Sequence, residues 1–225
     1  MRSKRYQQSA AMVEADRTYT IAQAVELLKK IPSGRFDATV ELHIRLGLDR
    51  SHSDQSVRGS VTLPHGTGKT KRIAVFAEQA KQEAARQSGA NVVGGEELIA
   101  AIKSSGKCEF DVAIATPAMM PKLAGIAKIL GPKGLMPSPK NDTITTAIAK
   151  TIEELNKGKI TFKNDATGNV HVTVGKASWE NARLVENIQR FLEALLKAKP
   201  SSSKGVFIKT ITLASTMGPG IRVSL

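Results

Sequence analysis

The stretch Pro64–Thr70, with the sequence PHGTGKT, comes closest in this chain to a known chemical motif. A phosphate-binding loop has the pattern G-x-x-x-x-G-K-S/T, in which backbone amides and the lysine hold phosphate groups. The last three residues of the stretch match the end of that pattern, but Leu63 stands where the first glycine is required. The spacing therefore fails. A proline and two glycines so close together instead predict a hinge at Pro64, Gly66 and Gly68.

Histidine and cysteine side chains are the next candidates for chemistry. His43, His52 and His65 have no metal-ligand spacing with one another or with Cys108, which is the single cysteine. A lone cysteine cannot form a disulfide within the chain, and it is typical of a reducing cytoplasm. We find no nucleophile in a pattern with a general base. The sequence therefore predicts no catalytic residue, no metal site and no cofactor.

A Gly/Pro-rich loop at Ile129–Lys140, with the sequence ILGPKGLMPSPK, carries lysines that could face phosphate groups. These are Lys128, Lys133 and Lys140. Composition alone equally allows a solvated loop with no ligand. The loop remains a candidate phosphate contact and nothing stronger.

The charge of the chain points to a polyanionic partner. The 225 residues carry a formal net charge of +13, and such an excess is usually matched by RNA, DNA or an acidic membrane surface. Residues 1–65 carry 10 Lys/Arg and 7 Asp/Glu, and residues 157–225 carry 11 and 4, so these segments hold ten of the thirteen net positive charges. No apolar run reaches the roughly 18–20 residues of a membrane span, and no signal peptide follows the basic N-terminus. We expect a cytoplasmic protein without a membrane partner.

The element that must position these residues is the stretch Phe36–Asp49, in which apolar and polar residues alternate. A period of two predicts a single β-strand about 40 Å long, with one buried and one wet face. Such a strand needs partners along its length, and the candidates are Ser56–Leu63 and Val206–Ala214. If the C-terminal segment returns to pair with it, everything between is an insertion.

The two outer parts of the chain together predict one two-layer α+β domain. Residues 1–66 contribute a basic helical arm, a helix that begins with a capping box at Thr20 and Gln23, and the strands above. Residues 159–225 contribute a hairpin whose turn is Asn164–Asn169, a helix from Ser178 to Ala198, and the last strand. Neither part has enough strands to bury its own helix, so we expect one split domain with a mostly antiparallel sheet.

Residues 67–158 change character and predict an inserted α/β domain with a Rossmann-like parallel sheet. No G-x-G-x-x-G follows the first strand, so a dinucleotide site is weakly supported. Short apolar strands alternate with helices. The expected strands are Arg72–Phe76, Asn91–Val93 and Phe110–Ala115, and the expected helices are Glu78–Ser88, Glu96–Lys103, Met119–Leu130 and Thr143–Asn156.

Four stretches in order along the chain carry a family resemblance: FDATVEL from Phe36, RGSVTLPHGTGK from Arg58, ILGPKGLMPSPK from Ile129 and STMGPG from Ser215. FKNDATGNVH from Phe162 and VGKAS from Val174 add to it. On these stretches the chain resembles the L-one family of the large ribosomal subunit, the universal stalk proteins, in its bacterial form. The resemblance covers nearly the whole chain.

The resemblance implies two domains, the first built from both chain ends and the second inserted, joined by a hinge near Pro64–Gly68 and at Gly158. It implies binding to large-subunit rRNA at the mobile stalk, beside exit-site tRNA and other ribosomal components, with assistance to the movement and release of deacylated tRNA. It also implies binding to the protein's own operon mRNA and repression of its translation. The implied protein is not an enzyme, and outside the ribosome it is a monomer.

The resemblance further implies which residues contact RNA. They lie on the first strand, in the hairpin and in the C-terminal T-M-G run: Phe36, Thr39, Lys163, Asp165, Thr167, Gly168, His171, Ser215, Thr216, Met217, Gly218 and Pro219. Further phosphate contacts are expected from Lys176, Arg2, Lys4, Arg5, Lys133 and Lys140. Many relatives have lysine where Ala166 stands, so one of their phosphate contacts is not expected here.

The residue types of the T-M-G run suit RNA, which proteins read through shape, phosphates, 2′-hydroxyls and unpaired bases. Thr216 offers a hydroxyl and Met217 a flexible apolar surface for a base or sugar. Gly218 allows close backbone approach, and Pro219 restrains the turn. The alternative function is a nucleotide-dependent enzyme that uses the inserted α/β domain and keeps the basic domain as an RNA tether.

Overall fold

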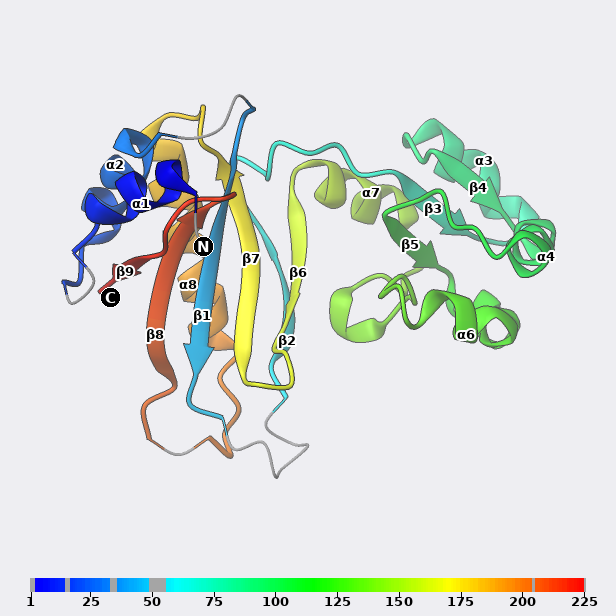
Figure 1. Cartoon of the computed structure of the whole chain (residues 1–225). Helices are drawn as coiled ribbons and strands as arrows, with labels where there is room; N and C mark the ends of the chain where they lie inside the picture. The colour runs from blue at the N-terminus through cyan, green and yellow to red at the C-terminus, as the bar shows by residue number, and fades with distance from the viewer. Residues whose placement is uncertain (1–2, 15–16, 33–35, 49–55, 204, 225) are drawn as a thin grey trace. The chain divides into compact units, whose positions relative to one another are not determined.

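The computed structural model describes residues 3–14, 17–32, 36–48, 56–203 and 205–224 (Figure 1). Its internal contacts divide the chain into two compact units. The first unit comprises Met1–Gly68 and Ile160–Leu225, and the second comprises Lys69–Lys159. The protein is a mixed α/β protein, and the second unit contains a parallel sheet. The functional domain boundaries 1–66, 67–158 and 159–225 stay a prediction.

The sheet of the first unit has the strand order β7-β1-β8-β9. Its strands are β7 (Asn169–Lys176), β1 (Thr39–Leu46), β8 (Ile208–Ser215) and β9 (Ile221–Val223), and neighbouring strands are antiparallel. β1 lies between β7 and β8 (Figure 1). The prediction that the C-terminal segment returns to pair with the first strand is therefore confirmed, with Leu42 opposite Leu213.

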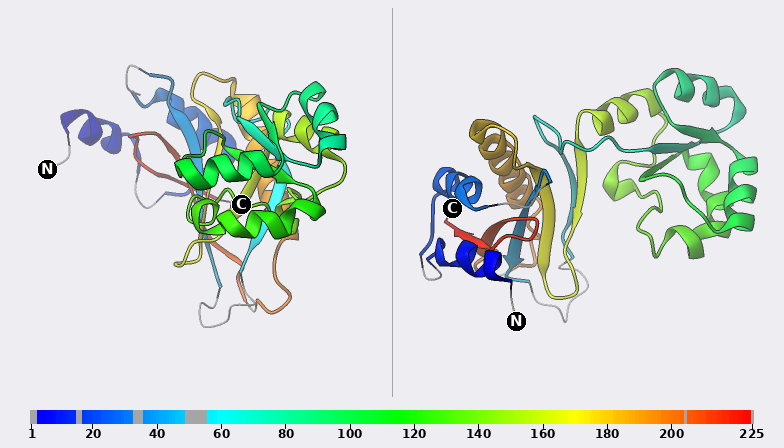
Figure 2. Two further views of the ribbon diagram at one scale, coloured as in Figure 1. Left: turned by 90° about the vertical axis from the view of Figure 1, so that its right-hand side faces the viewer. Right: turned by 45° about the horizontal axis from the view of Figure 1, so that its top comes forward.

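Helices α2 (Ile21–Lys30) and α8 (Asn181–Lys197) pack on the same side of this sheet (Figure 2). They cover the inward residues of β1, of which Val40, Leu42 and Ile44 are at most 1% exposed. The period of two predicted this buried face correctly. The predicted capping box is also confirmed, because Thr20 Oγ1 accepts from the Gln23 amide and Gln23 Oε1 accepts from the Thr20 amide. The N-terminal arm forms the helix α1 (Lys4–Ala11).

Two predictions about the first strand are wrong. β1 spans eight residues and not the whole of Phe36–Asp49. Its pairing with β8 shifts register after Arg45, and the Gly47 amide then donates to the Phe207 carbonyl at 2.7 Å, which ends the regular ladder. Asp49 lies outside the described residues. The segment Ser56–Leu63 does not pair with β1, since both edges of β1 are already occupied by β7 and β8.

That segment forms β2 (Arg58–Thr62), which pairs instead with β6 (Lys159–Lys163) in a separate small sheet. β6 and β7 are therefore joined as a hairpin only at their turn, where Asn164 bridges to Val170. The Asp165 amide closes the turn by donating to the Asn169 carbonyl at 2.8 Å. The prediction of a hairpin holds for the turn, while the two strands continue into different sheets.

In the second unit, parallel strands form the sheet β4-β3-β5. β3 (Ile73–Phe76) is buried throughout, as expected for a central parallel strand covered on both faces. Two separate hydrophobic cores pack the helices of this unit against the sheet. The remaining strands and helices are β4 (Val92–Gly94), β5 (Val112–Ala115), α3 (Gln79–Gln87), α4 (Glu96–Ser105), α5 (Met120–Leu123), α6 (Ala127–Leu130) and α7 (Ile148–Asn156), with short 3-10 helices η2 (Pro117–Met119), η3 (Ala124–Ile126) and η4 (Pro139–Asn141).

Two predicted helices of this unit differ from the structure. The segment Met119–Leu130 is not one helix but alternating short α and 3-10 turns, in keeping with Pro121 and Gly125 inside it, two residue types that disfavour a helix interior. The helix predicted from Thr143 begins only at Ile148. Before this helix, Ile144 instead makes an isolated parallel bridge to Ala115, the last residue of β5.

Candidate nucleic-acid interface

One end of the first unit's sheet gathers several of the predicted RNA residues. We call it the Met217 end and define it as Phe36, Thr39, Lys176 and Ser215–Pro219. Thr39 and Thr216 join its two strands: the Thr216 amide donates to the Thr39 carbonyl at 2.9 Å, and the Thr39 amide donates to Thr216 Oγ1 at 3.1 Å. The Thr216 hydroxyl also donates to the Thr39 carbonyl at 3.2 Å. These bonds fix where the following turn is presented.

The turn after Thr216 holds Met217 in a strained and exposed position. The Gly218 amide donates to the Ser215 carbonyl at 2.8 Å, and Met217 at the third position has φ +66°. A left-handed residue at that position is the type II arrangement, which usually requires glycine or asparagine. Met217 is 69% exposed and Phe36 is 51% exposed. An exposed apolar side chain held in a strained backbone conformation is typical of a functional surface.

Gly218 and Lys176 complete this end for different reasons. A Cβ on Gly218 would lie 2.3 Å from Ser215 Oγ and 3.2 Å from the Ser215 carbonyl oxygen, so a larger residue there would require the Ser215 side chain to move. Lys176 is the register partner of Thr39, and its Nζ donates to Thr39 Oγ1 at 3.1 Å. The ammonium group is thereby held at the start of β1. The Met217 end therefore combines exposed apolar side chains with a positioned cation.

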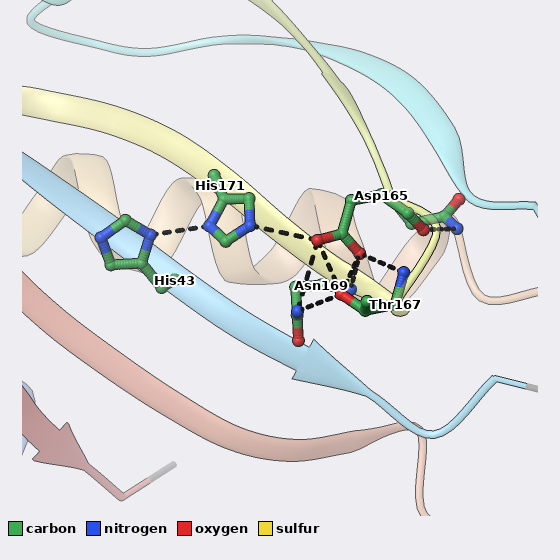
Figure 3. Close-up of polar contacts among 6 residues, drawn as sticks. His43, Asp165, Thr167, Asn169 and His171 are labelled. Carbon is green, nitrogen blue, oxygen red and sulfur yellow. Dashed lines mark hydrogen bonds and ion pairs between the residues drawn. The ribbon is translucent and has the colours of Figure 1, made fainter.

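The remaining predicted residues lie in and beside the β6–β7 turn, which we call the Asp165 end: Lys163, Asp165, Thr167, Gly168 and His171. Here the Asp165 carboxylate accepts from the amides of Thr167 and Asn169 at 2.8 and 2.7 Å, and from the Thr167 hydroxyl at 2.8 Å (Figure 3). These bonds, that from the Asn169 amide first, hold the pKa of Asp165 well below its usual range. Its carboxylate is occupied in building the turn.

The Asp165 end is also fastened to β1. Gly168 has φ +80°, and its carbonyl accepts from the Leu46 amide at 2.9 Å. His171 Nε2 lies 3.5 Å from Asp165 Oδ2. Lys163 is exposed at the end of β6. This end is a preformed polar turn held by its own hydrogen bonds.

The structure does not bring the predicted RNA residues to one point. Thr39 pairs with Lys176 at one end of β1, and Arg45 pairs with Asn169 near the other. Six residues along a strand correspond to about 20 Å. Between the two ends lies the sheet face opposite α2 and α8, which carries the polar residues of β1. The interface is therefore two clusters joined by a polar sheet face.

His43 on this face is a residue whose role the sequence analysis missed. Its Nδ1 lies 2.8 Å from His171 Nδ1, and the two rings meet edge to face (Figure 3). Burial, and then the neighbouring His171, lower the pKa of His43 below its usual 6.5. Both histidines fall at outward positions of predicted strands, but only the strand register, which the sequence does not contain, places them side by side.

The other predicted contacts are less constrained. Lys4 and Arg5 lie exposed at the start of α1, whereas Arg2 is outside the described residues. In the second unit, Lys133 Nζ donates to the Gly106 carbonyl at 3.3 Å. The side chain of Lys140 is outside the described part of the chain. These residues add no site of their own.

The predicted hinge residues include several left-handed glycines: Gly66 has φ +66°, Gly68 +74° and Gly158 +100°. Asn187, fully buried on α8, donates to the Gly66 carbonyl at 3.0 Å and accepts from the His65 amide at 3.2 Å. Pro64 is exposed beside this contact. The stretch up to Gly66 is thus held against the first unit, and its role as a hinge stays a prediction.

The second unit has a cleft of about 430 Å³ at the carboxyl ends of its strands, the usual ligand position in this type of sheet. Its charged lining is three glutamates and Lys122, and Lys122 Nζ already pairs with Glu96 at 2.5 Å. A net negative lining does not favour nucleotide phosphates. Within the described ranges, we find no group of three or more His, Cys, Asp or Glu side chains placed to hold a metal ion. Nor does any helix there have the length and apolar character to span a membrane.

The family model described as the ribosomal protein L1p/L10e family matches residues 27–219 of the chain. The chain belongs to this family. It is 48% identical over 223 residues to the "Large ribosomal subunit protein uL1" of Fervidobacterium nodosum, covering 99% of this chain and 95% of that protein. Proteins of the same name from Salinispora arenicola and Kosmotoga olearia are 51% and 48% identical, over 98% and 99% of this chain and 92% and 96% of theirs.

Family membership confirms the resemblance that the sequence motifs predicted. Since this is a family of ribosomal proteins, membership also supports the prediction that the chain is not an enzyme. The alternative of a nucleotide-dependent enzyme has neither the phosphate-loop spacing nor a suitably charged cleft in its favour. The polar interface of the first unit is therefore the candidate functional site.

Proposed function

We propose that the chain is a structural component of the large subunit of the cytoplasmic ribosome, and that it binds large-subunit rRNA with the sheet of its first unit. The observation that carries this proposal is the Met217 end. Here the Ser215–Gly218 turn and the Thr39–Thr216 bonds hold Met217 exposed in a left-handed conformation. Membership in a family of ribosomal proteins supports the same assignment.

The chemistry of the Met217 end suits folded RNA. Unpaired bases and sugars stack or pack on flat or flexible apolar side chains, which Phe36 and Met217 provide. The ammonium group of Lys176 lies at the same end and suits a phosphate. The Asp165 end, about 20 Å along β1, presents a turn that is already ordered before binding. Preordering reduces the entropy lost on association.

The finer parts of the proposal rest on the family resemblance. The RNA-binding domain comprises residues 1–66 and 159–225, and residues 67–158 form an inserted domain. The protein binds at the mobile stalk beside exit-site tRNA and assists the movement and release of deacylated tRNA. The same surface binds the messenger of its own operon and represses translation. Outside the ribosome the protein is a monomer.

The test is binding of the purified protein to a folded rRNA stalk fragment and to random RNA of the same length, at two salt concentrations. We expect the stalk fragment to bind about a thousandfold more tightly or better, which is the low end of the usual range for specific over non-specific recognition of nucleic acid. Affinity should fall as salt rises, because phosphate contacts release counterions. Equal affinity for the two RNAs would overturn the proposal. Competition by the operon messenger tests the repressor function separately.

A further inference from the structure

The open face of the first unit's sheet contains a row of polar residues that runs across its strands. His43 on β1 is the register partner of His171 on β7 and of Thr212 on β8, and Thr212 is the partner of Arg222 on β9. Register partners in a sheet point to the same face. The row therefore offers two imidazoles, a hydroxyl and a guanidinium side by side, between the Met217 end and the Asp165 end.

The hydrogen bond between His43 and His171 limits how many protons the ring nitrogens of these two histidines can carry together. Their Nδ1 atoms are 2.8 Å apart, so one histidine donates and the other accepts. The outer nitrogens face carboxylates: His171 Nε2 lies 3.5 Å from Asp165 Oδ2, and His43 Nε2 lies 3.8 Å from Glu41 Oε2. An uncharged pair has a proton for only one of these outer nitrogens.

One additional proton on the histidine pair allows both outer nitrogens to act as hydrogen-bond donors. Both outer nitrogens then carry N–H groups that face carboxylates, and the bond between the Nδ1 atoms remains. A second additional proton would place two N–H groups against each other across 2.8 Å and break the pair. The geometry thus suits a pair that carries a single positive charge.

In the free chain, other groups oppose this charge. Burial and His171 lower the pKa of His43, although Glu41 raises it. The guanidinium of Arg45 lies two residues further along β1, and that of Arg222 lies on the same row, while β8 contributes only Thr212 there. A bound anion would favour this charge, since the anion is attracted by both arginines and by the protonated pair, against the repulsion from the carboxylates of Glu41 and Asp165.

We propose that the row of His171, His43, Thr212 and Arg222, with Arg45 beside it, is a binding site for an RNA phosphodiester that takes up one proton on binding. The site lies between the two ends of the interface, so an RNA that spans both ends passes over it. This inference rests on the proposed binding of rRNA. It adds His43, Thr212, Arg222 and Arg45 to the contact surface and makes the affinity pH-dependent.

Proton linkage gives the direction of the effect. A ligand that binds the protonated pair better strengthens as the pH falls through the range in which the free pair gains its proton. We expect the affinity for the rRNA stalk fragment to be about fivefold to tenfold higher at pH 6 than at pH 8. One proton allows at most about a tenfold change per pH unit.

The test is isothermal titration of the full chain with the rRNA stalk fragment at pH 7, in buffers of different ionisation enthalpy, which measures proton uptake directly. The wild type should take up a substantial fraction of one proton per complex. The double variant His43→Gln and His171→Gln should bind the fragment more weakly and, measured at a concentration of fragment that saturates it, should lose that uptake. His65→Gln is the matched control, because His65 pairs with Glu186 away from the row and its removal should leave uptake unchanged.

Other outcomes decide against the inference. Tight binding of the fragment without proton uptake, or full uptake by the double variant, would contradict the phosphate site and leave the proposed rRNA binding intact. Absence of specific binding at every pH would instead contradict both. A further titration with inorganic phosphate alone should show no uptake, and uptake there would reassign the site to free phosphate.

Discussion

The two ends of the first unit's sheet present opposite kinds of surface. At the Met217 end, apolar side chains are exposed on a strained turn, and Met217 is 69% exposed, so little packing offsets the cost of its left-handed backbone. At the Asp165 end, a carboxylate accepts hydrogen bonds from Thr167 and Asn169, and the turn is satisfied within itself. The first end exposes apolar surface and a strained backbone that a bound partner could cover. The second end is a turn whose conformation is already fixed by its own hydrogen bonds.

This difference suggests that the two ends contribute to RNA binding in different ways. Strain and exposed apolar surface are costs that binding can offset, so we expect the Met217 end to supply most of the affinity. A prebuilt turn supplies orientation at little entropic cost, so we expect Asp165 to act through the shape it maintains. The following predictions separate affinity from stability at each end.

The largest expected effect is that of Met217→Asp on rRNA binding. A carboxylate at this position would repel phosphate, and aspartate tolerates the left-handed conformation, so the fold should be retained. We expect a loss of affinity for the stalk fragment of tenfold or more, or about 1.4 kcal/mol and above. Met12→Asp is the matched control, because Met12 is 44% exposed at the end of α1, outside both ends, and it should bind as the wild type does.

Asp165 should affect stability more than contact with RNA. Asp165→Ala removes the acceptor for two backbone amides, and because these bonds are exposed to solvent we expect a loss of only about 1 kcal/mol in the free energy of unfolding. Asp165→Asn keeps one acceptor oxygen and should lose less of the free energy of unfolding. The affinity of the Asp165→Asn protein for rRNA should stay within about twofold of the wild type. A large loss of affinity in a stable Asp165→Asn protein would show that the carboxylate itself contacts RNA.

The same residue gives a pH dependence of stability. Its folded pKa is depressed below the ordinary 3.8, so its contribution is present above that value and is lost as the pH falls through the folded pKa. The difference in unfolding free energy between wild type and Asp165→Asn should therefore be constant from pH 7 to pH 5 and shrink in more acidic solution. Chemical denaturation at several pH values measures it, and a difference that grows toward acid would contradict this explanation.

Met217→Gly should separate strain from contact at the first end. A left-handed conformation costs an ordinary residue roughly 1–2 kcal/mol, part of which glycine returns through its greater unfolded-state entropy. We expect the variant to be more stable by about 0.5–1 kcal/mol and to bind rRNA several-fold more weakly. Urea denaturation and the same binding assay provide both values. A variant that is no more stable would mean that Met217 is not strained.

The smallest effect is expected from Lys176→Gln. If its ammonium group contacts one phosphate, the slope of log affinity against log salt should become shallower by about 0.7–0.9. Lys197→Gln is the control, since Lys197 is exposed on the last turn of α8, on the helix side of the sheet. Equal slopes for the two variants would remove Lys176 from the interface.

Much of the first unit could be predicted because local patterns and partner requirements agreed. The alternation of Leu42 and Ile44 with polar residues located the buried face, and the lack of a nearby partner predicted the return of β8. The partner of β2 could not be predicted in the same way, because several strands share its pattern and only competition for the edges of β1 decides between them.

The functional ends show a similar limit. The T-M-G run was recognisable, but nothing in the sequence indicated that Met217 takes the left-handed conformation or that Gly218 lies close to Ser215. The expectation that Gly218 allows close approach to RNA stays a prediction. The pairing of His43 with His171 depends on the register of two strands 128 residues apart. A shift of one residue would turn the two side chains to opposite faces, and no local signal determines it.

The central claim is that both ends of the sheet belong to one RNA surface, which amide hydrogen exchange with and without the rRNA stalk fragment tests most directly. We predict that bound RNA slows exchange in the Ser215–Gly220 turn strongly, and in the turn between Asn164 and Asn169 more weakly. More amides of the second turn are already hydrogen-bonded in the free protein, namely those of Asn164, Asp165, Thr167, Gly168 and Asn169, compared with those of Thr216 and Gly218 in the first. Protection confined to one end, or found only in the second unit, would contradict the claim.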